Sequence, residues 1–242
     1  MADSFRFKQF TVSNERSAQK VGTDGVLLGA WVGLGGTEQH ILDVGTGTGV
    51  IALMLAQRCP AIVVGIDIDA PSVEEASANF NASPWGSRMA AFRGDFRGLG
   101  TAAAHPLAFL RCPYDLIISN PPFFNDSLKA PDERRSDARH SDTLSFGELA
   151  AEAAQLLSPE GRLAVIYPAE EAEKLAGEAL VAGLFPCRIC RVHTKKGTPA
   201  KRVMMEFSRQ KKEPLLEELH IMEAGEFTRE YRSLTGDFYI KF

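Results

Sequence analysis

In Ile41-Leu42-Asp43-Val44-Gly45-Thr46-Gly47-Thr48-Gly49, a short apolar run is followed by a turn with glycine at every second position. The apolar pattern that continues from Val50 to Arg58 is that of a helix. Such glycines permit a tight turn and a close approach of a ligand to the backbone, where the first N–H groups of the helix are free. In open α/β sheets, ligands bind at the carboxyl ends of the strands. This stretch therefore predicts both an α/β fold and the place of its ligand site.

The spacing of these glycines limits the kind of ligand. A dinucleotide fingerprint, G-x-G-x-x-G, requires a third glycine where this chain has Val50, and no Lys-Ser/Thr pair follows as in a phosphate-binding loop. The turn therefore need not hold a pyrophosphate.

Strand-like and helical segments alternate along most of the chain. We expect strands at 41–44, 62–67, 89–92, 115–119, 162–167, 187–194 and 202–208, and helices at 50–58, 72–82, 146–157 and 170–182. This alternation predicts an α/β fold with a seven-stranded, doubly wound, Rossmann-like sheet, mostly parallel. The last two strands are close in sequence and should form an antiparallel hairpin at one edge.

The segment before the first strand has a different pattern. Residues 5–12 alternate, and 26–34 form an apolar helical stretch entered through Thr23-Asp24-Gly25, with Thr23 or Asp24 as the expected N-cap. We therefore expect one domain over 1–242, with a short lid at 1–36 and a catalytic core at 37–242.

The composition is that of an ordinary globular protein. The chain has 242 residues, of which 45% are hydrophobic and 24% charged, and its formal net charge is −4. The sequence contains neither an apolar run of roughly 18 residues nor the layout of a secretory signal, so we expect a cytoplasmic protein without a membrane span. Cys187 and Cys190 lie three apart in a strand-like run, which favours a structural role over a redox or metal role.

Acidic residues end the second and third expected strands. Asp67 is positioned to accept hydrogen bonds from both ribose hydroxyls of an adenosine, and Asp95 from an adenine amine. Phe96 or Ile68 could flank the adenine ring. Together with the glycine-rich turn, these acids predict a site for a nucleoside without phosphates.

The four residues Asn120-Pro121-Pro122-Phe123 follow the strand-like run that ends at Ser119. Prolines cannot continue a strand, so the backbone leaves the sheet in a stiff, extended step. A carboxamide, the carbonyl of Pro121 and an aromatic ring can then face one cleft. Two acceptors and a ring suit a flat group that bears an NH₂, such as a nucleobase.

Positive charge is concentrated in one part of this acidic chain. Between Arg188 and Lys212 there are nine Lys or Arg and a single acid, Glu206. The loop 124–145 adds further cations and His140, which we regard as a bystander. These two segments predict contacts to RNA phosphates, although a solvated, lysine-rich edge hairpin would have the same composition.

Nearly the whole chain resembles one family. The turn and the acids resemble those of class I S-adenosylmethionine-dependent methyltransferases, and Asn120 to Phe123 resembles the branch that methylates amino groups. Residues 8–12, 20–31, 120–127 and 138–140 are similar to the tRNA1(Val) (adenine-37-N6)-methyltransferase family. The resemblance implies transfer of a methyl group from S-adenosylmethionine to the N6 amine of an adenine in tRNA. It also implies that Gly45, Thr46 and Gly47 contact the methionine part.

The sequence patterns and the resemblance together give each candidate residue a role. The catalytic residues are expected to be Asn120, Pro121, Pro122 and Phe123. The expected cofactor contacts are Thr23, Asp24, Asp43, Gly45, Thr46, Gly47, Gly49, Asp67, Ile68, Asp95 and Phe96. The expected tRNA contacts are Lys129, Arg134, Arg135, Arg139, Lys195, Lys196, Lys201 and Arg202. No metal is expected, and the protein should be a monomer.

Three other functions are compatible with parts of the sequence. A glutamine-amide methyltransferase acting on a protein such as a release factor would use the same planar NH₂, although that branch usually carries tyrosine in place of Phe123. A nicotinamide oxidoreductase is disfavoured by Val50. A non-catalytic RNA-binding protein could retain the fold without turnover.

Overall fold

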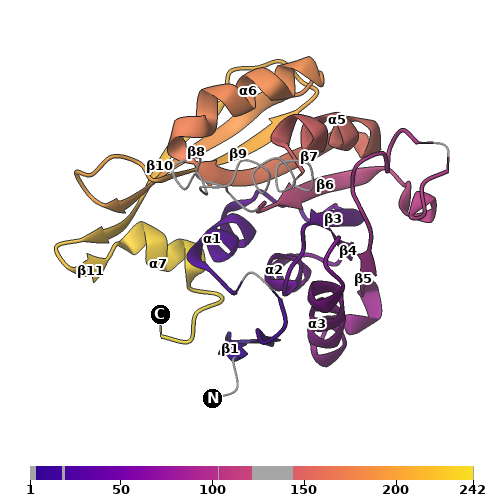
Figure 1. Ribbon diagram of the computed structural model, residues 1–242. Helices are drawn as coiled ribbons and strands as arrows, with labels where there is room; N and C mark the ends of the chain where they lie inside the picture. The colour runs from indigo at the N-terminus through magenta and orange to yellow at the C-terminus, as the bar shows by residue number, and fades with distance from the viewer. Residues whose placement is uncertain (1–3, 18–19, 103, 122–143, 242) are drawn as a thin grey trace, which may run out of the picture.

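The computed structural model describes residues 4–17, 20–102, 104–121 and 144–241. A nine-stranded sheet forms its centre, in the order β11-β10-β8-β9-β7-β6-β3-β4-β5 (Figure 1). Its strands are β3 (His40–Val44), β4 (Ile62–Asp67), β5 (Met89–Arg93), β6 (Tyr114–Ser119), β7 (Leu157–Pro168), β8 (Phe185–Lys195), β9 (Arg202–Ser208), β10 (Leu215–Glu223) and β11 (Glu226–Phe227). Strands β5, β4, β3, β6 and β7 pair in parallel. The predicted α/β, mostly parallel fold is confirmed.

Helices cover both faces of this sheet. In Figure 1, α1, α2, α3 and α7 lie on one face, and α5 and α6 on the other. Their bounds are α1 (Thr23–Trp31), α2 (Val50–Arg58), α3 (Ala70–Ala82), α5 (Phe146–Leu156), α6 (Ala172–Val181) and α7 (Arg229–Thr235), with short 3₁₀ turns at Gly86–Arg88, Ala108–Leu110 and Ala169–Glu171. None of the helices in the described ranges has the length and apolar character that a membrane crossing requires.

Alternation along the central strands divides the core into two halves. In β3, Ile41 packs into the cluster beneath α1 and α2, while its neighbour Leu42 packs into the cluster beneath α5 and α6. Ile118 and Ile117 of β6 divide in the same way. Successive side chains of a strand point to opposite faces, so a strand covered on both faces must be apolar throughout. This is why the central strands could be recognised in the sequence.

The N-terminal segment is attached to α3. Strands β1 (Ser4–Arg6) and β2 (Thr11–Ser13) form a separate two-stranded sheet. The carboxylate of Glu75 on α3 then accepts hydrogen bonds from the backbone N–H groups of Glu15, Arg16 and Ser17 at 2.6, 2.9 and 2.9 Å. A buried carboxylate thus fixes the chain just ahead of α1.

The predicted N-cap of α1 is wrong. The cap is Gly22, in an extended conformation and without a side-chain cap bond, so Thr23 and Asp24 are the first two residues of the helix. The Asp24 carboxylate instead accepts a hydrogen bond from Arg202 Nε. The Asp24 side chain is therefore directed toward β9 and does not cap its own helix.

The predicted number of strands is also wrong, because two strands lie beyond residue 208. Strand β10 pairs in parallel with β8, and β11 pairs with the end of β10. The antiparallel pair of β8 and β9 exists as expected, but it is internal to the sheet and not at its edge. Charged residues such as Glu217, Glu218 and Glu223 dilute the apolar pattern of β10, which is why the sequence did not reveal it.

The two cysteines of β8 are free thiols. Burial raises the pKa of Cys190 to about 12, and it also raises the pKa of Cys187. Both thiols are therefore protonated near neutral pH, which makes them poor nucleophiles and fits the structural role predicted for them.

Candidate functional site

The glycine-rich turn lies at the carboxyl end of β3, the central strand of the parallel half of the sheet. Gly45, Gly47 and Gly49 all have positive φ values, of 70°, 53° and 80°. The backbone N–H groups of Gly45 and Thr46 both donate to the carbonyl of Ile66, at 2.9 and 3.0 Å. The turn is thus held against the neighbouring strand β4 by the protein itself.

The three glycines have different surroundings. A Cβ atom on Gly45 would have no heavy atom within 4 Å, whereas one on Gly49 would lie 2.4 Å from the ring of Phe80. Gly49 is therefore required for packing, and Gly45 faces open space. A ligand can approach the backbone at Gly45, as a cofactor cradle requires.

Asp67 ends β4 and faces this turn. One of its carboxylate oxygens accepts from the Gly47 N–H and the other from the Asp69 N–H, both at 2.9 Å. Burial raises the pKa of Asp67, although the two backbone donors oppose this effect. Each oxygen keeps a lone pair, so the carboxylate can still accept the hydroxyls of a bound ribose.

Asp43 lies beneath the turn and is fully buried. Its Oδ2 accepts from the Thr46 hydroxyl at 2.8 Å, while Oδ1 has no hydrogen-bond partner among the described residues. Burial raises the pKa of Asp43 to about 7, more than the bond from Thr46 lowers it. An isolated buried carboxyl favours its neutral form.

Asp95 follows β5, but its carboxylate is engaged by a neighbour. Arg97 binds it through Nε at 2.8 and 3.1 Å and through Nη2 at 2.7 Å. Burial raises the pKa of Asp95, but the hydrogen bonds and charge of Arg97 outweigh burial, so the pKa lies below its ordinary value. Arg97 is thus a further candidate site residue, which the sequence signals only by placing a cation two positions after the acid.

The two candidates for stacking on an adenine ring differ in exposure. Phe96 is 3% exposed and belongs to the core beneath α5. Ile68 is 56% exposed at the end of β4, beside Asp67. Ile68 is therefore the apolar surface that is open to a ligand.

Asn120 leaves the sheet beside the glycine-rich turn. Strand β6 is the neighbour of β3, and Ser119 is the register partner of Val44. The Ser119 hydroxyl donates to the Val44 carbonyl at 2.8 Å, which ties the two strand ends together. Asn120 follows Ser119 and Gly45 follows Val44, so these two residues leave the sheet next to each other. Asn120 is half-buried and Pro121 is buried. Pro122 and Phe123 lie outside the described residues.

Comparison with known proteins identifies the family of this chain. Residues 25–180 match the family described as "Methyltransferase small domain". A Bacteroides fragilis protein named "tRNA1(Val) (adenine(37)-N6)-methyltransferase" is 45% identical to the chain over 98% of both lengths. A Phocaeicola vulgatus protein of the same name is 44% identical over 98% of this chain and 97% of its own. The chain belongs to this family.

The family resemblance expected from the sequence is thereby confirmed, as is membership of the class I S-adenosylmethionine-dependent methyltransferases. Among solved structures, a predicted O-methyltransferase from Agrobacterium tumefaciens matches with a TM-score of 0.65. It covers 89% of this chain and 96% of its own, at 18% sequence identity. At that identity, the likeness extends to the fold alone.

Four predicted tRNA contacts of this family member lie at the same edge of the sheet as the glycine-rich turn. Because β9 is antiparallel to both β7 and β8, β8 runs in the same direction as β7, β6 and β3, and the turn between β8 and β9 leaves the sheet at their carboxyl ends. Lys195, Lys196 and Lys201 are exposed there. Strands β6 and β8 are three strand spacings apart in the sheet, a distance of about 14 Å.

Some of these cations already have partners. Lys196 pairs with Glu223 at 2.7 Å, and Arg202 pairs with Asp24 at 2.7 Å. The latter pair joins a predicted tRNA contact to a predicted cofactor contact. Lys195 and Lys201 make no ion pair within the described ranges. The other predicted tRNA contacts, Lys129, Arg134, Arg135 and Arg139, lie outside the described residues, as does His140.

Proposed function

We propose that the protein transfers a methyl group from S-adenosylmethionine to the exocyclic N6 amine of an adenine in tRNA, adenine 37 of tRNA1(Val). The observation that carries this proposal is the adjacency of the Asn120–Pro121 step and the glycine-rich turn across the Ser119–Val44 pair. The names of the relatives supply the substrate. They favour tRNA over the amide of a glutamine in a protein.

The described residues fit the proposed cofactor. Gly45 leaves open space where the methionine part has to lie against the backbone. Asp67 has acceptor capacity for a ribose, and Ile68 offers an exposed apolar surface for an adenine. The cofactor, when bound, supplies an electrophilic methyl group.

The role of Asn120 and Pro121 follows from the chemistry of adenine. The lone pair of its exocyclic nitrogen is delocalised into the ring, so this amine is a weak nucleophile. Hydrogen bonds from the NH₂ group to the Asn120 side-chain oxygen and the Pro121 carbonyl would favour tetrahedral geometry and localise the lone pair. Catalysis then rests on positioning and on preorganised acceptors. Phe123 would stack on the base, worth roughly 1–3 kcal/mol.

We assign the remaining residues by their positions. The Asp95 carboxylate, which also binds Arg97, would accept a hydrogen bond from the adenine amine of the cofactor. The single domain 1–242 would use residues 1–36 as a cover, since Ser17 Oγ lies 3.5 Å from the position of a Cβ on Gly47. Lys195 and Lys201 would contact RNA phosphates. We expect a monomer in the cytoplasm, where tRNA is modified.

The test is mass spectrometry of nucleosides from tRNA incubated with the protein and S-adenosylmethionine. We expect N6-methyladenosine to appear, and release factor to remain unmodified. Asn120→Ala should lower turnover roughly 100-fold or more while cofactor affinity is retained. Asn81→Ala, on the exposed face of α3, is the matched control and should have normal activity. Methylation of release factor with untouched tRNA would refute the assignment.

A further inference from the structure

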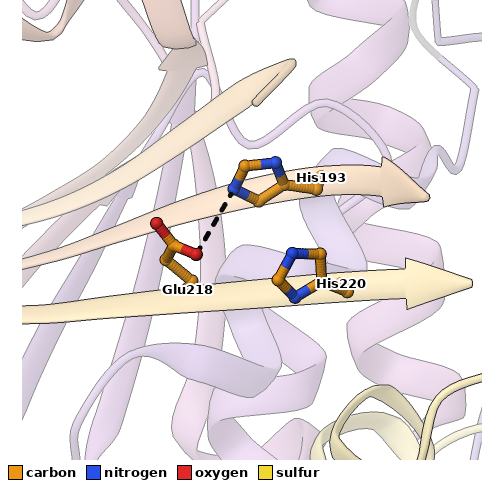
Figure 2. Close-up of side chains that lie close together, drawn as sticks. All are labelled: His193, Glu218 and His220. Atoms are coloured by element: carbon orange, nitrogen blue, oxygen red, sulfur yellow. Dashed lines mark ion pairs between the residues drawn. The ribbon is translucent and has the colours of Figure 1, made fainter. Parts of the chain in front are cut away.

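A cluster of three side chains on β8 and β10 includes none of the residues assigned to the proposed function. His193 of β8 and His220 of β10 are register partners in parallel strands. Their imidazole rings stack with centroids 4.6 Å apart and an angle of 20° between the ring planes. Glu218 precedes His220 by two residues and therefore lies on the same face of the sheet. Figure 2 shows its carboxylate directed toward His193.

The distances within the cluster suit a shared cation. One donor atom from each residue lies within 4.8 Å of the other two, and His193 Nε2 is 4.0 Å from Glu218 Oε2. The latter distance is too long for an N–H···O hydrogen bond. A tetrahedral ion with bonds of about 2.0–2.1 Å places its donor atoms about 3.4 Å apart. The donors therefore have to approach by up to about 1.4 Å. The exposed Glu218 side chain can move toward His193, and the His220 ring has to rotate out of the stack so that its in-plane lone pair points at the same ion.

The hydrogen bonding of His193 independently prepares it as a ligand. Its Nδ1 lies 2.6 Å from the Thr198 carbonyl oxygen, which can only accept, so Nδ1 carries the proton. In the neutral ring, Nε2 then holds the free lone pair. That atom is buried and has no hydrogen-bond partner among the described residues. A metal-binding histidine usually donates its second ring N–H to a backbone carbonyl or a carboxylate, as His193 does to Thr198.

From this geometry we propose that His193, Glu218 and His220 form a binding site for a divalent transition metal of the zinc class. Two imidazoles and one carboxylate match the ligand preference of Zn²⁺, and they leave a fourth position for water. Mg²⁺ and Ca²⁺ require oxygen ligands and are disfavoured. The proposal departs from the expectation of no metal, which the sequence favoured because these ligands are not close together along the chain.

The surrounding charge and the connectivity of the site define its role. Arg191 is the register partner of Glu218 and Lys195 that of Met222, so cations flank the cluster and weaken its attraction for metal. A bound ion would join β8 to β10. Through Thr198 it would also fix the turn that carries Lys195, Lys196 and Lys201. The proposed metal is therefore structural and takes no part in the chemical step of methyl transfer.

The test uses the full chain, stripped of metal with a chelator and titrated with Co²⁺, whose visible absorption reports tetrahedral coordination. We expect one ion per chain, displaced by Zn²⁺ and not by Mg²⁺. Saturating Zn²⁺ should raise the melting temperature by roughly 5–10 °C. His220→Asn and Glu218→Gln should each bind at least about tenfold more weakly and lose the shift. Glu218 is exposed, so Glu218→Gln should fold normally without metal.

His40 lies at the amino end of β3, outside this cluster. His40→Asn is therefore the control for nonspecific binding to histidine and should behave as the wild type. Equal Co²⁺ binding by the wild type and both cluster variants would overturn the proposal. So would an absorption band typical of cobalt–thiolate bonds, since the described cysteines are not part of this cluster.

Discussion

Gly45 and Gly49 share a left-handed backbone conformation but should respond to substitution in opposite ways. Their φ values are 70° and 80°, so alanine at either position is strained by roughly 1–2 kcal/mol. At Gly49 the new methyl group would also lie 2.4 Å from the ring of Phe80, which is 1% exposed. Overpacking of this kind costs roughly 1–3 kcal/mol more.

We therefore expect Gly49→Ala to lower the free energy of unfolding by roughly 2–5 kcal/mol, and Gly45→Ala by only the roughly 1–2 kcal/mol of strain. The affinity for S-adenosylmethionine should follow the reverse order. The Gly45 methyl group would enter the space where the cofactor has to lie, so binding should weaken at least about tenfold. Folded Gly49→Ala should bind nearly normally.

Urea denaturation and calorimetry with the cofactor measure the two effects separately. Adding Phe80→Leu to Gly49→Ala makes room for the methyl group, and the double-mutant cycle should show a favourable coupling of roughly 1 kcal/mol or more. Equal destabilisation by Gly45→Ala and Gly49→Ala, with unchanged cofactor affinity in Gly45→Ala, would refute these two roles.

Three further predictions concern charged residues. The pKa of Asp43 in the folded protein, about 7, lies above its ordinary value of 3.8, so the contribution of its neutral form to stability should be lost as pH rises from 4 to 7. Relative to Asp43→Asn, the free energy of unfolding of the wild type should fall by an amount on the order of 4 kcal/mol over this range. Parallel pH profiles of the two proteins would contradict this. Glu206 is 2% exposed, pairs with Arg162 at 2.8 Å and accepts from the Gly33 N–H at 2.7 Å; Glu206→Gln should cost about 3 kcal/mol in urea denaturation, against almost nothing for the exposed Glu213→Gln. Replacing Lys195 and Lys201 by alanine should raise KM for tRNA and reduce its salt dependence, with cofactor affinity unchanged and Lys174→Ala on α6 as the control; a KM for tRNA indifferent to salt in the wild type would exclude these phosphate contacts.

The central part of the fold could be predicted because its signals are local. Residues 50–58 and 62–67 match α2 and β4 at both ends. Most of their residues are apolar, Gly49 directly precedes α2, and Pro60 lies between the end of α2 and the start of β4. The position of the candidate site followed from the same signals, since parallel strands bring their carboxyl ends to one edge.

The parts that were missed depend on contacts between distant residues. The Asp24–Arg202 pair spans 178 positions. It explains why Asp24 does not cap α1, and it means that an expected cofactor contact (Asp24) and an expected tRNA contact (Arg202) bind each other. The His193–His220 pairing exists because β10 adds in parallel to β8. Sequence spacing does not specify that register, so neither the pairing nor the two outer strands could be predicted.

The two hydrogen bonds from Gly45 and Thr46 to the Ile66 carbonyl have a consequence for recognition. They close the turn through contacts within the protein, so its shape is established during folding and not by the incoming molecule. Less conformational freedom is then lost when a guest arrives, and more of the interaction energy remains as affinity. The cradle should thus act as a rigid receptor.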